Sequence, residues 1–138
     1  MIAKEYLKSI KYLDSAINAK QAELDRLRHD IENIKAVSYN SSKVQSNSIS
    51  DPTKIIDKII DLSYEINDEI DCLVDLKAEA HTKISKVYNK RFISLLTDIY
   101  INGYTLEQVA ERMNKSYETI RAWHGQALQI FRKENNMT

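Results

Sequence analysis

The sequence predicts an all-α fold, and three observations carry this prediction. The 138 residues contain only two Gly and one Pro, with abundant Ile, Leu, Lys, Glu and Asp, which is typical of helical proteins. Two long stretches repeat apolar residues at heptad spacing, which predicts an antiparallel coiled-coil helical hairpin within residues 1–88. A shorter apolar repeat with capping residues follows, which predicts a helix-turn-helix within residues 89–138.

The first heptad repeat runs over residues 2–37. Taking Ala3 as position a, nine of the ten a and d positions hold an apolar, aromatic or Ala residue, and Lys20 is the exception. Such a helix would be roughly 50 Å long and must bury its seam against a partner, because it is not stable alone in water. The a and d positions hold Ala3, Tyr6, Ile10, Leu13, Ile17, Lys20, Leu24, Leu27, Ile31 and Ile34.

A second long helix begins at Asp51 and Pro52, with Asp as the cap and Pro as the first helical residue. If the chain folds back as a hairpin, Lys20 lies level with Glu69. Opposite charges then meet at the single break of each seam and set the register of the two helices. The second seam runs through Ile55, Ile59, Leu62, Ile66, Glu69, Leu73, Leu76 and Ala80.

A flanking apolar face on the second helix is wider than a two-helix seam requires. Its members are Ile56, Ile60, Ile70 and Val74. We expect this surplus to pair hairpins into a homo-oligomer, most simply a dimeric four-helix assembly.

The segment between the two helices, residues 38–51, is rich in Ser and Asn. This composition predicts a loop. Its length exceeds that of most helix–helix connections, so it is either a solvated linker or a segment with a function of its own.

Residues 103–131 carry the most regular local pattern in the chain. Thr105 and Gln108 fit a capping box, and Gly103 suits a left-handed residue just before it. Asn114 suits a left-handed turn, and Ser116 then caps a second helix. The apolar positions are Leu106, Val109, Ala110 and Met113 in the first helix, and Ile120, Trp123, Ala127, Leu128 and Phe131 in the second. A preceding helix from Arg91 covers this core with Phe92, Leu95, Leu96, Ile99 and Tyr100.

The second helix of the motif is expected to place its outer face in the major groove of double-stranded DNA. Arg pairs bidentately with guanine and Gln with adenine, and Ala suits contact with a thymine methyl. Gly125 costs roughly 1 kcal/mol against Ala inside a helix, and close approach to DNA is a reason to retain it. The base-reading candidates are Arg121, Gln126, Glu118, Ala122 and Gly125, with Gln129 on the same face, and the phosphate candidates are Ser116, Tyr117, Lys115, Arg112 and Thr119. The alternative is a plain bundle of two amphipathic helices in which Gly125 is incidental.

The charge of the chain is unevenly distributed, although the net charge is zero. Residues 1–82 hold 11 Lys or Arg and 15 Asp or Glu, which gives −4, and residues 83–138 hold 9 and 5, which gives +4. The basic half contains the helix-turn-helix, as a phosphate-binding surface requires. Four cations lie at the junction between the acidic and the basic half, and they either reach phosphates or form a solvated helix face. They are Lys83, Lys86, Lys90 and Arg91.

The sequence shows no pattern for catalysis, a cofactor or a metal. It has no Gly-rich phosphate loop and no Cys or His cluster at metal-ligand spacing. His124 falls on the inner side of its helix, where packing or hydrogen bonding is expected. The single Cys72, the charged N-terminus and the lack of a long apolar run predict a cytoplasmic protein without membrane contact.

The run YINGYTLEQVAERMNKSYETIRAWHGQALQIF, from Tyr100 to Phe131, resembles region four of bacterial sigma factors. It is still more similar to phage late-transcription regulators of the ArpU and RinA type, in which an HG-x-AL segment that resembles HGQAL, His124 to Leu128, ends the recognition helix. A related phage family with a long N-terminal helical half is similar over most of the chain, in the AKEYL start, in the VQS at Val44 to Ser46, and in the run from Asp61 to Lys77. Two positions depart from the pattern, since Lys115 replaces an apolar residue and Asn114 replaces Gly.

This resemblance implies a phage or prophage activator of late genes that acts with host RNA polymerase in the cytoplasm of a bacterial cell. Two other functions remain compatible with the sequence. A small terminase-like DNA-packaging subunit also joins a helix-turn-helix to a helical oligomerisation region. A sigma-like module that docks on other proteins without binding DNA is the second.

Overall fold

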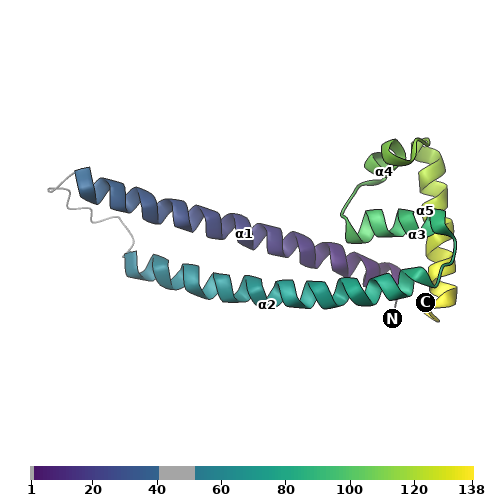
Figure 1. The fold of residues 1–138 in the computed structure, drawn as a ribbon, viewed down its shortest axis with the longest axis horizontal. Helices are drawn as coiled ribbons and strands as arrows, with labels where there is room; N and C mark the ends of the chain where they lie inside the picture. Colours follow the sequence, from purple (N-terminus) through teal and green to yellow (C-terminus); the bar gives the residue numbers. More distant parts are fainter. Residues whose placement is uncertain (1, 41–51) are drawn as a thin grey trace. The chain divides into compact units, whose positions relative to one another are not determined.

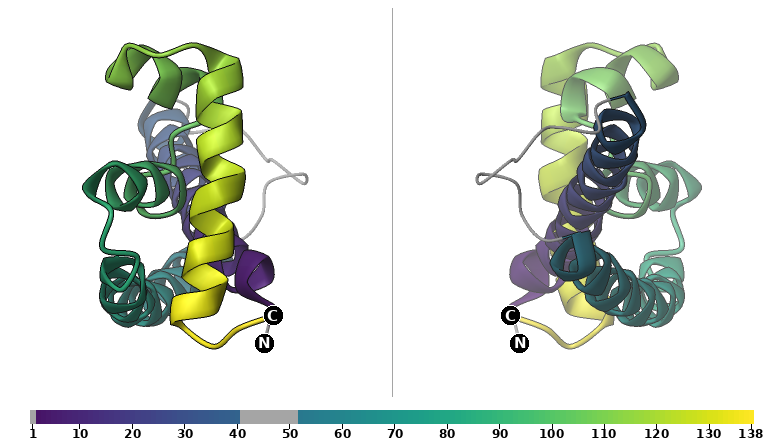
Figure 2. Two further views of the ribbon diagram at one scale, coloured as in Figure 1. Left: turned by 90° about the vertical axis from the view of Figure 1, so that its right-hand side faces the viewer. Right: turned by 90° about the vertical axis from the view of Figure 1, so that its left-hand side faces the viewer.

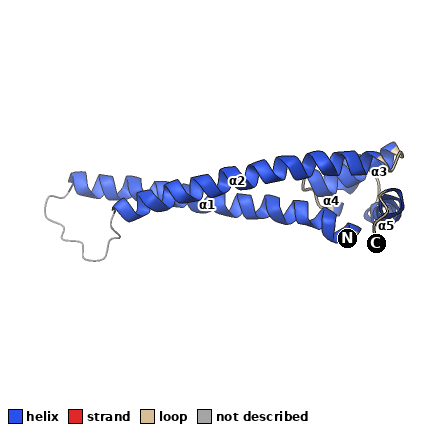
Figure 3. Ribbon diagram, turned by 90° about the horizontal axis from the view of Figure 1, so that it is seen from below, coloured by secondary structure: helices blue, strands red, loops and turns tan. Residues whose placement is uncertain are grey.

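The computed structural model describes residues 2–40 and 52–138, with only the backbone described for residues 37–40. Every regular element in these ranges is a helix, which confirms the predicted all-α fold (Figures 1 and 3). The elements are α1 (Ala3–Asn40), α2 (Pro52–Ser85), α3 (Lys90–Leu96), the π-helix η1 (Thr97–Ile101), α4 (Leu106–Met113) and α5 (Tyr117–Glu134). The chain divides into two compact units, one formed by Ser15–Asp71 and the other by Met1–Asp14 with Cys72–Thr138.

The unit Ser15–Asp71 consists of two antiparallel helix segments that pack in the predicted register, with Lys20 level with Glu69. Ile17 and Leu24 from α1 and Ile66 from α2 are buried in its seam. The Lys20 ammonium donates a hydrogen bond to Glu69 and lies 3.5 Å from Glu65 Oε2. The expected pairing of the two charged seam positions is therefore confirmed.

Two details of this pair differ from the predictions. The backbone of α1 is helical through Asn40, so the predicted loop does not begin at residue 38. The stretch AVSYN contains neither Gly nor Pro, so nothing in it stops the helix; the rest of the predicted loop, including Val44–Ser46, and the predicted cap Asp51 lie outside the described residues. Several seam positions, namely Leu27, Ile34, Ile59 and Leu62, are only half-buried because a single partner helix covers one side of each helix.

The second unit contains the helix-turn-helix. Its core includes most of the predicted apolar positions of α3, η1, α4 and α5, and Leu95, Leu96, Val109, Ile120, Ala127 and Phe131 are fully buried, whereas Leu106 and Met113 are only half-buried. α2 ends at Ser85, Tyr88 then adopts a left-handed conformation with φ of 63°, and the Asn89 side chain caps α3 by accepting from the backbone N–H groups of Arg91 and Phe92. The last turn before the motif is the π-helix η1, which the sequence did not predict.

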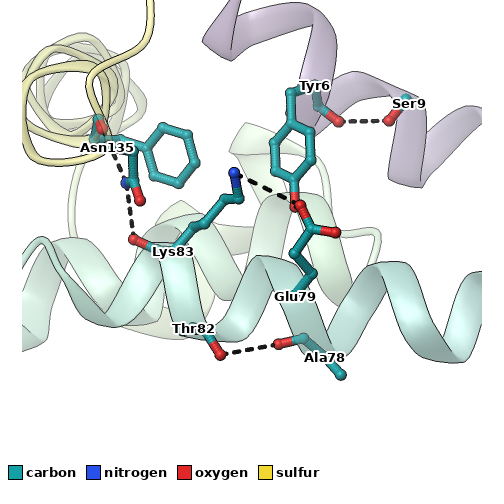
Figure 4. Close-up of polar contacts among 8 residues, drawn as sticks. Tyr6, Ser9, Ala78, Glu79, Thr82, Lys83 and Asn135 are labelled. Atoms are coloured by element: carbon teal, nitrogen blue, oxygen red, sulfur yellow. Dashed lines mark hydrogen bonds and ion pairs between the residues drawn. The ribbon is translucent and has the colours of Figure 1, made fainter. Parts of the chain in front are cut away.

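Within this unit, the C-terminal half of α5 packs against the first turns of α1 and the last turns of α2 (Figure 2). The Tyr6 and Phe131 rings stack with centroids 6.5 Å apart. The Asn135 amide donates to the Lys83 carbonyl at 3.0 Å, while the Tyr6 hydroxyl donates to Glu79 at 3.1 Å (Figure 4). The Ala3 N–H donates to the Thr138 carbonyl at 3.1 Å. The base of the hairpin is thus part of the same compact unit as the helix-turn-helix.

Candidate nucleic-acid interface

The first helix of the motif, α4, begins with the predicted capping box. The Gln108 N–H donates to Thr105 Oγ1 at 3.2 Å, and the Thr105 N–H donates to Gln108 Oε1 at 2.9 Å. Gly103 precedes it with φ of 79°, in the left-handed region that Gly adopts without strain. Two backbone N–H groups at the start of α4, which have no carbonyl partner within the helix, are therefore hydrogen-bonded to side chains.

The turn between α4 and α5 is also as predicted. Asn114 has φ of 55° and ψ of 47°, a left-handed conformation that Asn tolerates better than most residues. The Thr119 N–H donates to Ser116 Oγ at 3.2 Å, which caps α5. The reversal brings α4 against α5, and Val109, Ala110 and Ile120 are all buried. The replacement of Gly by Asn at residue 114 leaves this geometry intact.

The outer face of α5 is exposed and slightly concave. One shallow hollow is lined by Glu118, Arg121, Ala122, Gly125, Gln126 and Gln129. These are the five predicted base-reading residues together with Gln129. All six are exposed, and none of their charged groups forms an ion pair among the described residues. The face therefore offers donors and acceptors that the protein itself leaves unused.

Gly125 makes no packing contact with other elements in the described part of the chain. A Cβ atom built at this position would meet no atom within 4 Å. Gly in a helix interior costs roughly 1 kcal/mol of stability relative to Ala. No contact among the described residues offsets this cost at residue 125. The geometry is compatible with a partner surface that approaches the backbone of α5 at this point.

The N-terminal tip of α5 holds three of the predicted phosphate contacts. The hydroxyls of Ser116 and Thr119 lie 2.8 Å apart, and the Tyr117 side chain is 41% exposed. The Ser116 hydroxyl caps the helix and the Thr119 hydroxyl is hydrogen-bonded to it, so both are held at the positive end of the helix dipole. An 18-residue helix with polar groups ordered at its start suits contact with an anion such as a phosphate.

Trp123 is not part of the buried face, contrary to the prediction. It is half-exposed, and two cations lie on its ring. Arg91 Cζ is 4.6 Å and Lys115 Nζ is 6.0 Å from the ring centroid. The indole has a large flat surface that a cation can cover, so partial exposure costs it less than it would an aliphatic residue. For Arg91 the sequence left phosphate contact and a solvated helix face open; its contact with Trp123 was not predicted, because no local pattern links it to a Trp that lies far along the chain.

Arg112, the remaining phosphate candidate, contacts two neighbouring side chains, Tyr104 and Asp98. Its guanidinium lies 4.5 Å from the Tyr104 ring centroid, and its Nε is 3.6 Å from Asp98 Oδ2. The side chain is still 53% exposed. Contact with a phosphate would therefore compete with a weak ion pair and not with a buried one.

Tyr100 and His124 connect η1 to the inner side of α5. The Tyr100 hydroxyl and His124 Nε2 lie 2.7 Å apart in a half-buried position. Burial raises the pKa of Tyr100 to about 12. Burial lowers the pKa of His124, and the charges of Lys4 and Lys11 lower it further. The pair thus serves packing and hydrogen bonding, as the position of His124 in the helix predicted.

Within residues 2–40 and 52–138, no group of His, Cys, Asp or Glu side chains is placed to hold a metal ion. None of the helices in these ranges combines the length and the apolar character needed to cross a bilayer.

The arrangement of α3, η1, α4 and α5 defines a helix-turn-helix domain with an exposed second helix. A family model described as sigma-70, region 4, matches residues 89–133, which include α3, η1, α4 and all but the last residue of α5. Residues 89–133 are therefore a sigma-70 region 4 domain, a helix-turn-helix of the DNA-binding kind, and the resemblance to sigma region four is confirmed over this segment. Comparison with curated proteins and with solved structures finds no match.

Proposed function

We propose that this protein is a sequence-specific DNA-binding transcription regulator, and that the outer face of α5 reads its target. The observation that carries the proposal is the hollow on α5, where Arg121 and Gln126 flank Ala122 and Gly125. Arg and Gln provide the bidentate pairs that distinguish guanine and adenine in the major groove. Lys115, Arg112 and the helix tip at Ser116, Tyr117 and Thr119 are the proposed phosphate contacts, since they lie on or beside the same helix.

We extend this list by Arg91. Its guanidinium lies on the Trp123 ring beside α5, and among the described residues it has no carboxylate partner. Two cations that share one indole without a counter-ion favour binding of an anion. Arg91 and Lys115 are therefore proposed to contact the DNA backbone at the edge of the groove.

We further propose that the regulator activates late genes of a phage or prophage together with host RNA polymerase, and that it works as a homo-oligomer. The likeness to ArpU- and RinA-type regulators supports the first part. The sigma-type domain supports a polymerase partner, because the same domain type belongs to the polymerase specificity subunit. The exposed apolar residues of α2 support the oligomer.

In vitro transcription tests this proposal. The template carries the DNA site that the protein selects, upstream of a core promoter, and purified host RNA polymerase is added with wild-type protein or with Arg121→Ala. We expect the wild-type protein to raise transcript yield and the variant to lose this effect. Specific DNA binding without any change in transcription would contradict the activator role. That result is the one expected of a DNA-packaging subunit. Polymerase binding without DNA affinity would contradict DNA reading altogether.

A further inference from the structure

α2 carries two heptad seams, and α1 covers only one of them. The inner seam is the one that contains Ile66 and Leu73, both buried. A second series of positions, each one residue after a position of the inner seam, repeats along α2 with the same alternating spacing of four and three residues. We call this series the outer seam, and it consists of Ile56, Ile60, Ser63, Asn67, Ile70 and Val74.

The outer seam is exposed along its apolar positions. The exposed fractions are 45% for Ile56, 47% for Ile60, 39% for Ile70 and 60% for Val74. Large apolar side chains at heptad spacing on one helix are the signature of a helix that packs against two partners. The spacing therefore specifies the shape of the missing partner, which is another long helix.

The polar residues of the outer seam indicate which helix this partner is. With Ile60, Asn67 and Val74 at a positions, the d positions hold Ile56, Ser63 and Ile70. The Ser63 hydroxyl already donates to the Ile59 carbonyl at 2.7 Å, so it needs no outside partner. Asn67 is exposed and would be left in an apolar contact by a foreign apolar helix. A second copy supplies the same Asn at the same level, which is the arrangement that fixes register in parallel two-stranded coils.

Charge determines the direction of the second helix. The e positions beside the outer seam hold Asp57, Tyr64 and Asp71, whereas the g positions are the inner-seam residues that face α1. An antiparallel pair would bring e residues opposite e residues, and so Asp57 near Asp71 of the other copy. A parallel pair keeps the two acidic rows apart. Like charges that face each other destabilise a helix pair, so the charge pattern favours the parallel arrangement.

We propose that the outer seam of α2 binds the outer seam of a second copy in parallel, about a two-fold axis along the helices. Such an interface is isologous, since each copy contributes the same surface. The C-terminal ends of both α2 helices then lie at one end of the contact, so that two helix-turn-helix segments are delivered to one DNA molecule. This contact specifies the homo-oligomer named in the proposed function; it does not depend on the proposed DNA reading, and only its consequence for paired half-sites rests on that reading.

Sedimentation equilibrium and cysteine cross-linking test this contact on the full chain. We expect the wild-type protein to be a dimer at micromolar concentration and Ile60→Asp/Ile70→Asp to be a monomer with unchanged helical content by circular dichroism. Both side chains are exposed in the single chain, so the substitutions leave its core intact. Tyr12→Asp removes an exposed aromatic residue on α1 and serves as the matched control that remains dimeric. A monomeric wild-type protein, or a dimer that survives both Asp substitutions, would overturn the proposal.

Direction is tested in a background in which Cys72, the single native cysteine, is replaced by Ser. Ile56→Cys should form a disulfide with itself in a parallel pair. In an antiparallel pair about residue 65, the two copies of the introduced cysteine would be about 27 Å apart, and Ile56→Cys would cross-link with Val74→Cys instead. Cross-linking of that mixed pair alone would overturn the parallel arrangement.

A DNA readout separates this inference from the proposed function. The monomeric variant should bind a duplex with two half-sites at least about tenfold more weakly, because avidity is lost, while its affinity for a single half-site is unchanged. Equal affinity of wild type and variant for the two-site duplex would contradict delivery of two helix-turn-helix segments. Loss of all DNA affinity in a protein that is still dimeric would contradict the proposed function and leave the outer seam valid.

Discussion

The hydroxyl of Tyr100 lies 2.7 Å from Nε2 of His124, so that the π-helix before the motif is bonded to the helix that carries the proposed base contacts. The neutral imidazole accepts from, or donates to, this hydroxyl according to its tautomer. The phenol stays protonated at neutral pH because burial raises the pKa of Tyr100 to about 12. The contact ties η1 to α5 on the side opposite the surface that is proposed to face DNA.

This contact predicts a pH-dependent stability. Burial, together with Lys4 and Lys11, lowers the pKa of His124 in the folded protein, so the unfolded chain binds its proton more readily. The contribution of His124 to stability is therefore complete above its unfolded pKa and is lost as the pH falls through the folded pKa. Urea unfolding of wild type and His124→Gln should differ by about 1 kcal/mol at pH 7 and by less at pH 5. A difference that is the same at both pH values would contradict this role.

The pair Lys20–Glu69 predicts a second stability effect. Lys20 donates to one oxygen of Glu69, while the other oxygen is buried without a hydrogen-bond partner in the described structure. Lys20→Met leaves the whole carboxylate unpaired, and we expect a loss of about 1–3 kcal/mol in urea unfolding. The double variant Lys20→Leu/Glu69→Leu should recover most of this loss, because it removes both charges from the seam. If the double variant is less stable than the single one, the ion pair is itself a net source of stability.

The two glycines of the chain predict opposite results for the same substitution. Gly125→Ala should raise the free energy of unfolding by about 1 kcal/mol, because the added methyl meets open space in a helix. It should also weaken binding to the cognate DNA by about tenfold if the backbone of α5 is closely approached there. Gly103→Ala, at φ of 79°, should cost about 1–2 kcal/mol of stability. An alanine at residue 125 that leaves DNA affinity unchanged would show that this glycine is incidental.

Arg121 and Lys115 separate base reading from backbone contact. Arg121→Ala should cost about 1–3 kcal/mol on the cognate duplex and relax specificity at one base position, as expected for a bidentate contact with guanine. Lys115→Ala should weaken binding to all duplexes alike and reduce the salt dependence by about one phosphate contact. Fluorescence anisotropy with cognate and scrambled duplexes at two salt concentrations measures both effects. Uniform weakening by Arg121→Ala would reassign Arg121 to the backbone.

Local chemistry explains which parts of the fold were predictable. The capping box of Thr105 and Gln108 and the left-handed Asn114 depend on residues a few positions apart, so the sequence specifies them directly. The pairing of Lys20 with Glu69 was predictable because heptad spacing makes position along one helix determine position along the other.

Several of the features that escaped prediction are contacts between residues far apart in the chain. Arg91 on Trp123 and Tyr6 on Phe131 join separate helices, and no periodicity encodes such contacts. The face assigned to Trp123 was wrong because helical phase alone cannot distinguish a buried indole from one covered by cations. For the proposed site, the sequence defined the outer face of α5 and offered Arg91 as one of two alternatives, but it did not place Arg91 on Trp123 at the edge of that face.

The most direct test of the central claim is selection of bound sites from randomised double-stranded DNA, repeated at low and moderate salt. We expect the 138-residue protein to enrich a defined motif at both concentrations, arranged as two half-sites, and Arg121→Ala to enrich a motif that is degenerate at one position of each half-site. Weak binding with no enriched motif, abolished at moderate salt, would contradict sequence reading by α5 and would identify the chain as a protein-docking module.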